Sequence, residues 1–307
     1  MGAGRISARR LWVAVESVHA VTYFAPACRH ARRDAGLKGF WAGYFAARAA
    51  PLGPVDAGPV IAAFFNFEPA MVRRAVPACW DVIDPAQLTV GRAAAAAEAL
   101  TELCSADSLA GLVGARALLR GAAANCDGAG RIMTEANRQL WPAVETGLRR
   151  LDLTAEHMAV AEAWQACTTL REHRGDGHVA ALVAHDLSGL EAHLLAAGTQ
   201  GLPAEVLRDS RGWSASQWEA GRVRLAARGL LHPDGAATED GLAARRGVEL
   251  VTDELAERAL AALDDEEVGR LYGALFPAAA NIQRSGTLPF PNPMGLPELE
   301  GAPGQAP

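Results

Sequence analysis

The chain has 307 residues, half of them hydrophobic, and a formal net charge of −6. This length suits two domains that each bury a core, and no apolar run reaches the ~18–20 residues of a membrane span. The mild acidity argues against a non-specific nucleic-acid binder, which would need a dominant basic face. Five scattered cysteines without a C-x-x-C pair argue against a zinc ribbon or a disulfide framework. With no signal-peptide pattern at the start, we expect a reduced, cytoplasmic protein.

Abundant alanine and few aromatic residues predict a mainly helical fold. The first helix carries Glu16 and His19 on one face, with Tyr23 one turn further on. In the first half we expect helices over residues 5–24, 37–50, 68–74, 89–120 and 131–141.

The second half begins with a helix that starts near residue 154 and ends in the densest run of ionisable side chains, residues 170–182. Gly175 should break this helix, and Asp176 should cap a new helix over 177–185. Further helices are expected over residues 187–197, 203–210, 215–229, 238–258 and 264–282.

The charged run at 170–182 is the first candidate site. His173, Asp176 and His178 could present two imidazoles and a carboxylate to a divalent metal. In the competing interpretation Asp176 is only a helix cap and both histidines are solvated. A metal is therefore a minor possibility, and no cofactor is predicted.

Residues 187–258 follow the order of a winged helix-turn-helix, with Asp234-Gly235 at the tip of a short hairpin. The run Arg224–Leu231, Asp234-Gly235 and Thr238–Gly241 resembles the corresponding segment of MarR-type regulators. Four side chains on the helix 215–229 are candidate contacts to DNA bases, because arginine and glutamine donate to base edges: Gln217, Arg222, Arg224 and Arg228. A degenerate winged helix that serves only for packing is the alternative.

A shift of 150 residues superimposes several marked positions, such as Arg74 on Arg224 and Tyr23 on His173. The sequence therefore predicts a mainly α protein of two winged-helix-like halves, a tandem duplication with small β-hairpin wings. The predicted parts are a winged-helix-like repeat with a helical linker (5–150), a MarR-like winged-helix repeat (151–284) and a flexible tail (285–307).

The whole chain is also similar to an uncharacterised actinobacterial helix-turn-helix family. The segments that carry this likeness are residues 19–24, 39–45, 170–182, 211–214 and 292–295. The resemblance implies the fold and supplies no catalytic residues.

We expect a ligand-binding cleft between the two halves, because clefts at such interfaces are common ligand sites. Its predicted residues are Glu16, His19, Tyr23, Arg171, Glu172, His173, Arg174, Asp176 and His178. Arg171 and Arg174 suit a small anionic ligand. Two hypotheses follow: a DNA-binding or ligand-responsive transcriptional regulator, or a non-regulatory ligand-binding protein or enzyme that uses the cleft. No membrane partner is expected.

Overall fold

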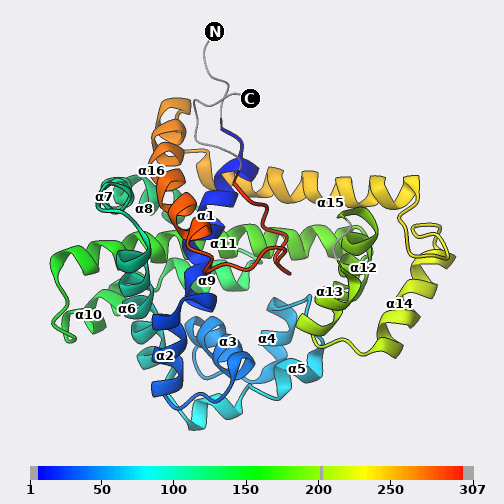
Figure 1. Ribbon diagram of the computed structural model, residues 1–307, viewed down its shortest axis with the longest axis horizontal. Helices are drawn as coiled ribbons and strands as arrows, with labels where there is room; N and C mark the ends of the chain where they lie inside the picture. The colour runs from blue at the N-terminus through cyan, green and yellow to red at the C-terminus, as the bar shows by residue number, and fades with distance from the viewer. Residues whose placement is uncertain (1–5, 201–202, 300–307) are drawn as a thin grey trace.

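The computed structural model describes residues 6–200 and 203–299. Within these residues the chain forms sixteen α-helices, three short 3-10 helices and no β-strand (Figure 1). The prediction of a mainly α protein is therefore confirmed. Residue 5 of the predicted first helix and residues 300–307 of the predicted tail lie outside the described residues.

The first half consists of ten helices, several of which begin where the sequence offers a capping side chain or a proline. The Ser7 side chain accepts a hydrogen bond at the start of the first helix, and Pro26 separates this helix from the second. The helices are α1 (Ala8–Phe24), α2 (Pro26–Asp34), α3 (Phe40–Ala49), α4 (Ala57–Ala63), α5 (Pro69–Arg73), α6 (Pro85–Leu103), α7 (Ala106–Gly114), α8 (Arg116–Ala124), α9 (Ile132–Arg138) and α10 (Trp141–Arg149).

The second half has longer helices. Thr154, Ser214 and Thr238 cap three of them by accepting a hydrogen bond from a backbone N–H in the first turn. The helices are α11 (Ala155–Ala184), α12 (Gly189–Gln200), α13 (Ala204–Ser210), α14 (Ala215–Ala227), α15 (Glu239–Glu257) and α16 (Asp265–Arg284). The 3-10 helices are Ala50–Leu52, Ala78–Asp81 and Arg258–Leu260.

Helix α11 runs through the middle of the molecule and packs against α1, α6, α8, α9 and α15 (Figure 1). The predicted break at Gly175 is wrong, because α11 continues without interruption to Ala184. A glycine costs a helix only about 1 kcal/mol relative to alanine, and burial along α11 exceeds that cost. Gly177 also allows a close approach, since a Cβ there would lie 3.3 Å from the Cβ of Leu255 in α15.

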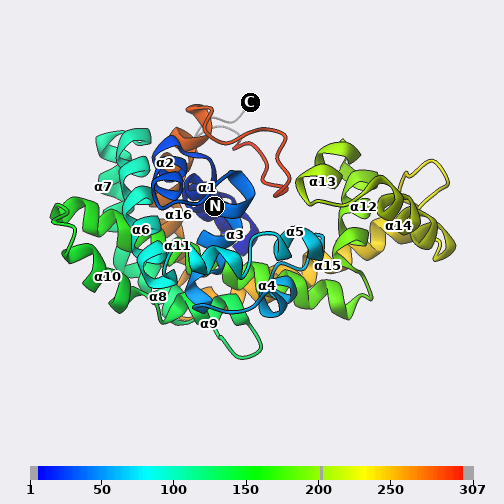
Figure 2. The same ribbon diagram turned by 90° about the horizontal axis from the view of Figure 1, so that it is seen from below.

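Helices α12, α13 and α14 form a small unit at one end of the molecule (Figures 1 and 2). Its apolar core is separate from the main one and contains Leu190, Leu194, Leu225 and Leu231. The main core instead lies around Trp164 of α11, between the helices at the opposite end of the molecule. The α12–α14 unit is thus a distinct packing unit joined to the body by α11 and α15.

The predicted β-hairpin wing is wrong. Between α14 and α15 there is a single isolated bridge, from Leu231 to Ala237, and no strand among the described residues. The bridge cannot lengthen into strands, because Pro233 on the turn side has no N–H to donate and Thr238 on the other side already caps α15. The N–H of Ala237 points away from Leu231 and donates to Gly198 O of α12 at 3.2 Å. The prediction of two winged-helix-like halves from a tandem duplication falls with it, because the described part of neither half contains a wing.

After α16 the chain returns across the molecule without helical structure (Figure 1). Asn292 shapes this return, because its side chain accepts from the N–H of Leu296 at 3.0 Å and donates to the carbonyl of Leu296 at 2.8 Å. The return brings residues 293–295 beside the α12–α14 unit.

Among the described residues no single helix is long and apolar enough to cross a membrane. Only α11 taken together with Gly189–Thr199 meets the criteria of length and composition, and that pair is bent by 93°.

Candidate ligand-binding cavity

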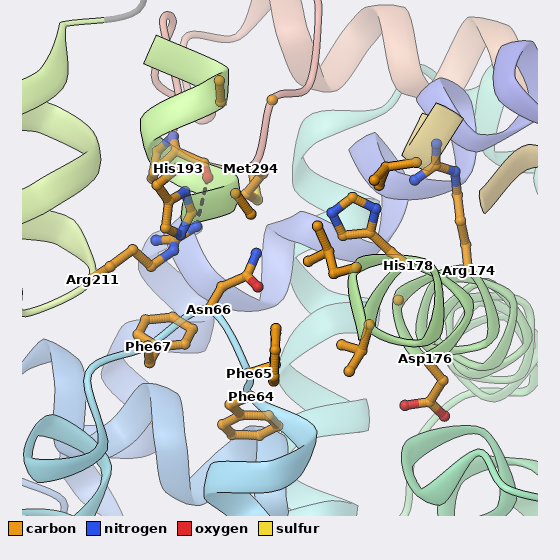
Figure 3. A pocket seen from close by; sticks show the side chains of 18 of the residues that line it. Phe64, Phe65, Asn66, Phe67, Arg174, Asp176, His178, His193, Arg211 and Met294 are labelled. Atoms are coloured by element: carbon orange, nitrogen blue, oxygen red, sulfur yellow. Dashed lines mark hydrogen bonds between the residues drawn. The ribbon is translucent and has the colours of Figure 1, made fainter. Parts of the chain in front are cut away.

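A cavity of about 220 Å³ lies where the two halves of the chain meet. Residues of α1, α3 and segment 64–67 line it from the first half, and residues of α11, α12 and α15 from the second (Figure 3). Residues 293–295 also line it. Because pockets for drug-sized ligands usually measure about 300–1,000 Å³, this volume suits a small molecule.

One wall of the cavity is an ion-pair network between α1, α11 and α15. Asp253 accepts from Arg9 Nε at 2.8 Å and from Arg174 Nη2 at 3.0 Å, and Glu249 pairs with the same two arginines. The Arg174 guanidinium also lies 4.4 Å from the centre of the Trp12 ring, within range of a cation–π contact. Arg245 of α15 also pairs with Glu249, at 3.4 Å, so two carboxylates face three arginines at this wall.

A second charged cluster surrounds Glu172, which is 1% exposed. Arg48 donates to both of its carboxylate oxygens at 3.0 Å, and Arg171 donates at 2.8 Å. Arg171 also lies 3.3 Å from Glu16 of α1. Burial would raise the pKa of Glu172, but Arg171 and Arg48 hold it well below its usual value. Glu172 is thus a buried anion that holds two arginines at the edge of the cavity.

The opposite side of the cavity is more apolar and contains Phe67, His193 and Arg211 (Figure 3). Arg211 lies in the turn between α13 and α14, with its guanidinium 4.7 Å from the centre of the Phe67 ring. Its Nη2 donates to the carbonyl of Pro293 at 2.6 Å. Burial lowers the pKa of His193 to about 3, and Arg211 adds to the shift. His193 is therefore neutral at physiological pH.

Buried polar atoms without a hydrogen-bond partner are concentrated at this cavity. Leaving such an atom unsatisfied costs about 1–3 kcal/mol, so a group of them around one cavity favours a ligand that completes the bonds. Those on cavity-lining residues are Glu16 Oε1, Asn66 Oδ1, Arg174 Nε, His193 Nε2 and Arg211 Nε.

The structure places five of the nine residues predicted for the cleft at this cavity. Glu16, Arg171, Arg174, Asp176 and His178 line the cavity. His19, Tyr23, Glu172 and His173 are not among its lining residues, and Glu172 acts through its two arginines.

His19 and Tyr23 lie in the main core. The Nε2 of His19 is 2.8 Å from the hydroxyl of Tyr23, and its Nδ1 is 3.0 Å from the hydroxyl of Thr168. Trp164 stacks on the His19 ring. Burial, aided by the charge of Arg171, places the pKa of His19 well below its usual value. This neutral, fully bonded histidine joins α1 to α11.

The three side chains considered as possible metal ligands, His173, Asp176 and His178, have separate partners. His173 lies 3.2 Å from the carbonyl of Leu255, and Arg131 lies 3.0 Å from its ring. Asp176 accepts from the N–H and the hydroxyl of Thr134, both at 2.8 Å, so it caps α9 and not the predicted helix. Its carboxylate points away from the cavity (Figure 3). Among the described residues no three His, Cys, Asp or Glu side chains are grouped as metal ligands.

His178 is the predicted histidine that lines the cavity. Its Nδ1 lies 3.1 Å from the hydroxyl of Thr252 in α15, and burial lowers its pKa to about 4. The imidazole therefore faces a ligand as a neutral group.

Sequence reasoning missed several lining residues that come from distant segments. Arg9, Trp12, Arg48, Asn66, His193, Arg211, Arg245 and Glu249 are among them. Two signals were present, because Arg211 and residues 293–295 fall within the segments that carried the family likeness. Nothing in the spacing of the others indicates a shared site.

Helix α14 places all four predicted DNA-contacting residues near its exposed side, and each has a partner within the protein. Gln217 accepts from the N–H of Ser214 at 2.9 Å, and Arg222 pairs with Glu219 at 2.6 Å. Arg224 pairs with Glu191 of α12 at 3.4 Å. Arg228 donates to the carbonyl of Asp186 at 2.8 Å.

Helices α12, α13 and α14 follow one another closely, with α12 packed against both of the others and a short turn between α13 and α14. A family model described as a helix-turn-helix family matches residues 8–289, and the chain belongs to this family. Comparison with curated proteins found no match, and comparison with solved structures found none. The predicted helix-turn-helix family is thus confirmed, whereas the narrower resemblances to MarR-type regulators and to an actinobacterial group stay predictions.

Proposed function

We propose that this helix-turn-helix protein binds DNA through α14 and that a small organic anion in the cavity controls this binding. The observation that carries the proposal is the place of Arg211. It lines the cavity and lies in the turn that leads directly into α14. An anion at Arg211 would therefore act on the segment that sets the direction of α14.

The same turn is attached to the other parts of the cavity. The carbonyl of Arg211 accepts from the N–H of Glu68 at 2.9 Å, and Trp213 Nε1 donates to the carbonyl of Asn66 at 3.2 Å. Arg211 itself bonds Pro293. A ligand that rearranges these hydrogen bonds can therefore shift α14 without disturbing the main core.

The charge of the cavity supports an anion. Six arginines line the cavity. Five of them (Arg9, Arg48, Arg171, Arg174 and Arg245) pair with four carboxylates (Glu16, Glu172, Glu249 and Asp253), and no carboxylate among the described residues pairs with Arg211. In a buried site an uncompensated guanidinium is an anchor for a carboxylate or phosphate.

The test is a selection of bound duplexes from a random DNA library, followed by mobility shifts at several salt concentrations. A selected duplex should lose affinity steeply with salt, because phosphate contacts release counterions. Arg224→Gln, on the exposed side of α14, should weaken the shift, whereas Arg270→Gln on α16, at the far end of the molecule, should not. Retention of full affinity in Arg224→Gln would refute the role of α14.

One observation favours a second function. Arg222, Arg224 and Arg228 are each paired with a carboxylate of the protein, so DNA would have to displace these pairs. A non-regulatory ligand-binding protein, or an enzyme that works in the cavity, has no such requirement. If no duplex is enriched in the selection while the cavity binds an organic acid, this second function replaces the first.

A further inference from the structure

The Arg211 side of the cavity differs from the rest in how its charge is compensated. The other five arginines that line the cavity each contact at least one carboxylate. Arg211 is 9% exposed, and among the described residues it donates hydrogen bonds only to backbone carbonyls and to the hydroxyl of Ser210. A buried positive charge of this kind is costly unless it is paired.

Three unpartnered polar atoms belong to this side of the cavity. They are Nε of Arg211, Nε2 of His193 and Oδ1 of Asn66. Figure 3 shows the three side chains gathered on one side, away from Arg174 and His178. His193 is 6% exposed. This grouping presents a positive donor, a neutral imidazole and a carboxamide to the same space.

The surfaces next to these atoms are apolar. Phe65, Leu187, Leu195 and Leu207 line the cavity beside them, and Phe67 lies under the Arg211 guanidinium. A ligand there needs an apolar body in addition to its charged end.

We propose that this subsite binds a small 2-hydroxy carboxylic acid with an apolar or aromatic body. The carboxylate accepts hydrogen bonds from Arg211 and His193, and the neighbouring hydroxyl bonds the Asn66 carboxamide. The inference rests on the proposed anion-binding function of the cavity and assigns it a ligand class.

The chemistry of the three atoms separates this class from other anions. The unpartnered atom of Asn66 is its side-chain oxygen, which needs a donor. A phosphate dianion offers only acceptors and would leave this oxygen unsatisfied. A hydroxyl satisfies either end of a carboxamide, because it both donates and accepts. A 2-amino acid would bring an ammonium group into a cavity that already has more arginines than paired carboxylates.

The probes are 3-phenyllactate (both enantiomers), its deoxy analogue 3-phenylpropanoate, and phenyl phosphate, measured by isothermal titration calorimetry on the full chain. We expect one enantiomer of phenyllactate to bind about five- to tenfold more tightly than phenylpropanoate, the value of roughly one hydrogen bond. Asn66→Ala should abolish this difference while keeping the weaker binding common to both acids.

Arg211→Met should abolish binding of both acids. Its fold should be retained, because methionine removes an unpaired buried charge and keeps the contact with Phe67; a thermal melt verifies this. His193→Phe is a second variant with the same expected loss. Arg270→Gln on α16 is the control and should bind as the wild type does.

The outcomes are distinguishable. Equal binding of phenyllactate and phenylpropanoate, or a preference for phenyl phosphate, overturns the inference and leaves an anion-binding cavity in place. Acid binding that survives Arg211→Met but is lost in Arg174→Gln places the anion at the other wall. This result also overturns the inference and leaves an anion-binding cavity in place. If the folded wild-type protein binds none of the three anions, the inference is overturned, and the ligand part of the proposed function loses its support as well.

Discussion

The arginines of the cavity and those of α14 are in opposite physical situations. Arg174 is 9% exposed and keeps a buried Nε without a partner, although two carboxylates contact it. The Arg224 side chain is 54% exposed and shares Glu191 with Arg228. Each buried ion pair has displaced water and must be compensated in place, whereas the α14 pairs can exchange their partners with solvent or DNA. The comparison separates a preorganised site from an adaptable surface.

The largest change in stability should come from substituting Glu172, whose carboxylate compensates two buried arginines. Glu172→Gln should lower the free energy of unfolding by about 3–5 kcal/mol, because Arg48 and Arg171 lose their shared counter-charge. Urea denaturation measures this. Glu266→Gln, which breaks an exposed pair with Arg270, is the control, with an expected change of about 0–1 kcal/mol. Equal effects of the two substitutions would remove the distinction between buried and exposed pairs.

Gly189→Ala tests the contact between α12 and the segment 64–67 that lines the cavity. A Cβ at Gly189 would lie 2.1 Å from the carbonyl oxygen of Phe65. Overpacking of this kind costs about 1–3 kcal/mol, and the thermal midpoint should fall. Gly269→Ala in α16 meets nothing within 4 Å and should raise stability by about 0.5–1 kcal/mol. A rise for both variants would mean that α12 does not press on Phe65.

The buried histidines predict acid sensitivity. Burial lowers the pKa of His178 to about 4 and of His193 to about 3, against about 6.5 in the unfolded chain. Between these values the unfolded chain takes up protons that the native state refuses. The part of the free energy of unfolding that depends on these two histidines should therefore fall as the pH drops below about 6.5 and stop changing below about 3–4. At still lower pH the buried carboxylate Glu172, whose pKa is held below its usual value, continues to lower stability.

At pH 5 the expected loss is on the order of 1–2 kcal/mol for each histidine. Urea midpoints at pH 7.5, 6 and 5 measure it, and His193→Gln should flatten the profile. A profile identical to that of the wild type would show that His193 is not held neutral by burial.

The smallest change in stability should come from a substitution on α14. Arg224→Gln should alter the free energy of unfolding by about 0–1 kcal/mol, because exposed pairs contribute little and Glu191 keeps its bonds to Ser188. The urea midpoint measures it. A loss comparable to that of Glu172→Gln would mean that α14 is held by its charges and is not an adaptable surface.

Much of the local structure could be predicted from the sequence. Caps and prolines such as Ser7, Pro26 and Thr154 mark helix starts by local hydrogen bonding and a restricted φ, effects that need no distant partner. Glycine and Asp-Gly signals misled, at Gly175 and at Asp234-Gly235. In the first case burial exceeded a small propensity cost. In the second, Pro233 and the cap of α15 at Thr238 leave room for a single bridge only.

The candidate site was predictable only in part. Glu16, Arg171, Arg174 and His178 stood out because charged and imidazole groups interrupt apolar helices. His19 and Tyr23 carry the same signal and bond each other in the core, since sequence spacing does not distinguish a buried hydrogen bond from a ligand contact.

The sequence by itself determined the helical class, most helix starts and the polar character of residues 170–182. Only the tertiary structure decided which polar groups face a common space. Arg48, Asn66, His193 and Arg211 come from four separate segments and share the cavity because α11, α12 and the 64–67 segment pack together. Local propensities act over one helical turn, whereas the pairing of Arg48 with Glu172 joins residues 124 positions apart, and it forms only when the surrounding apolar surface is buried.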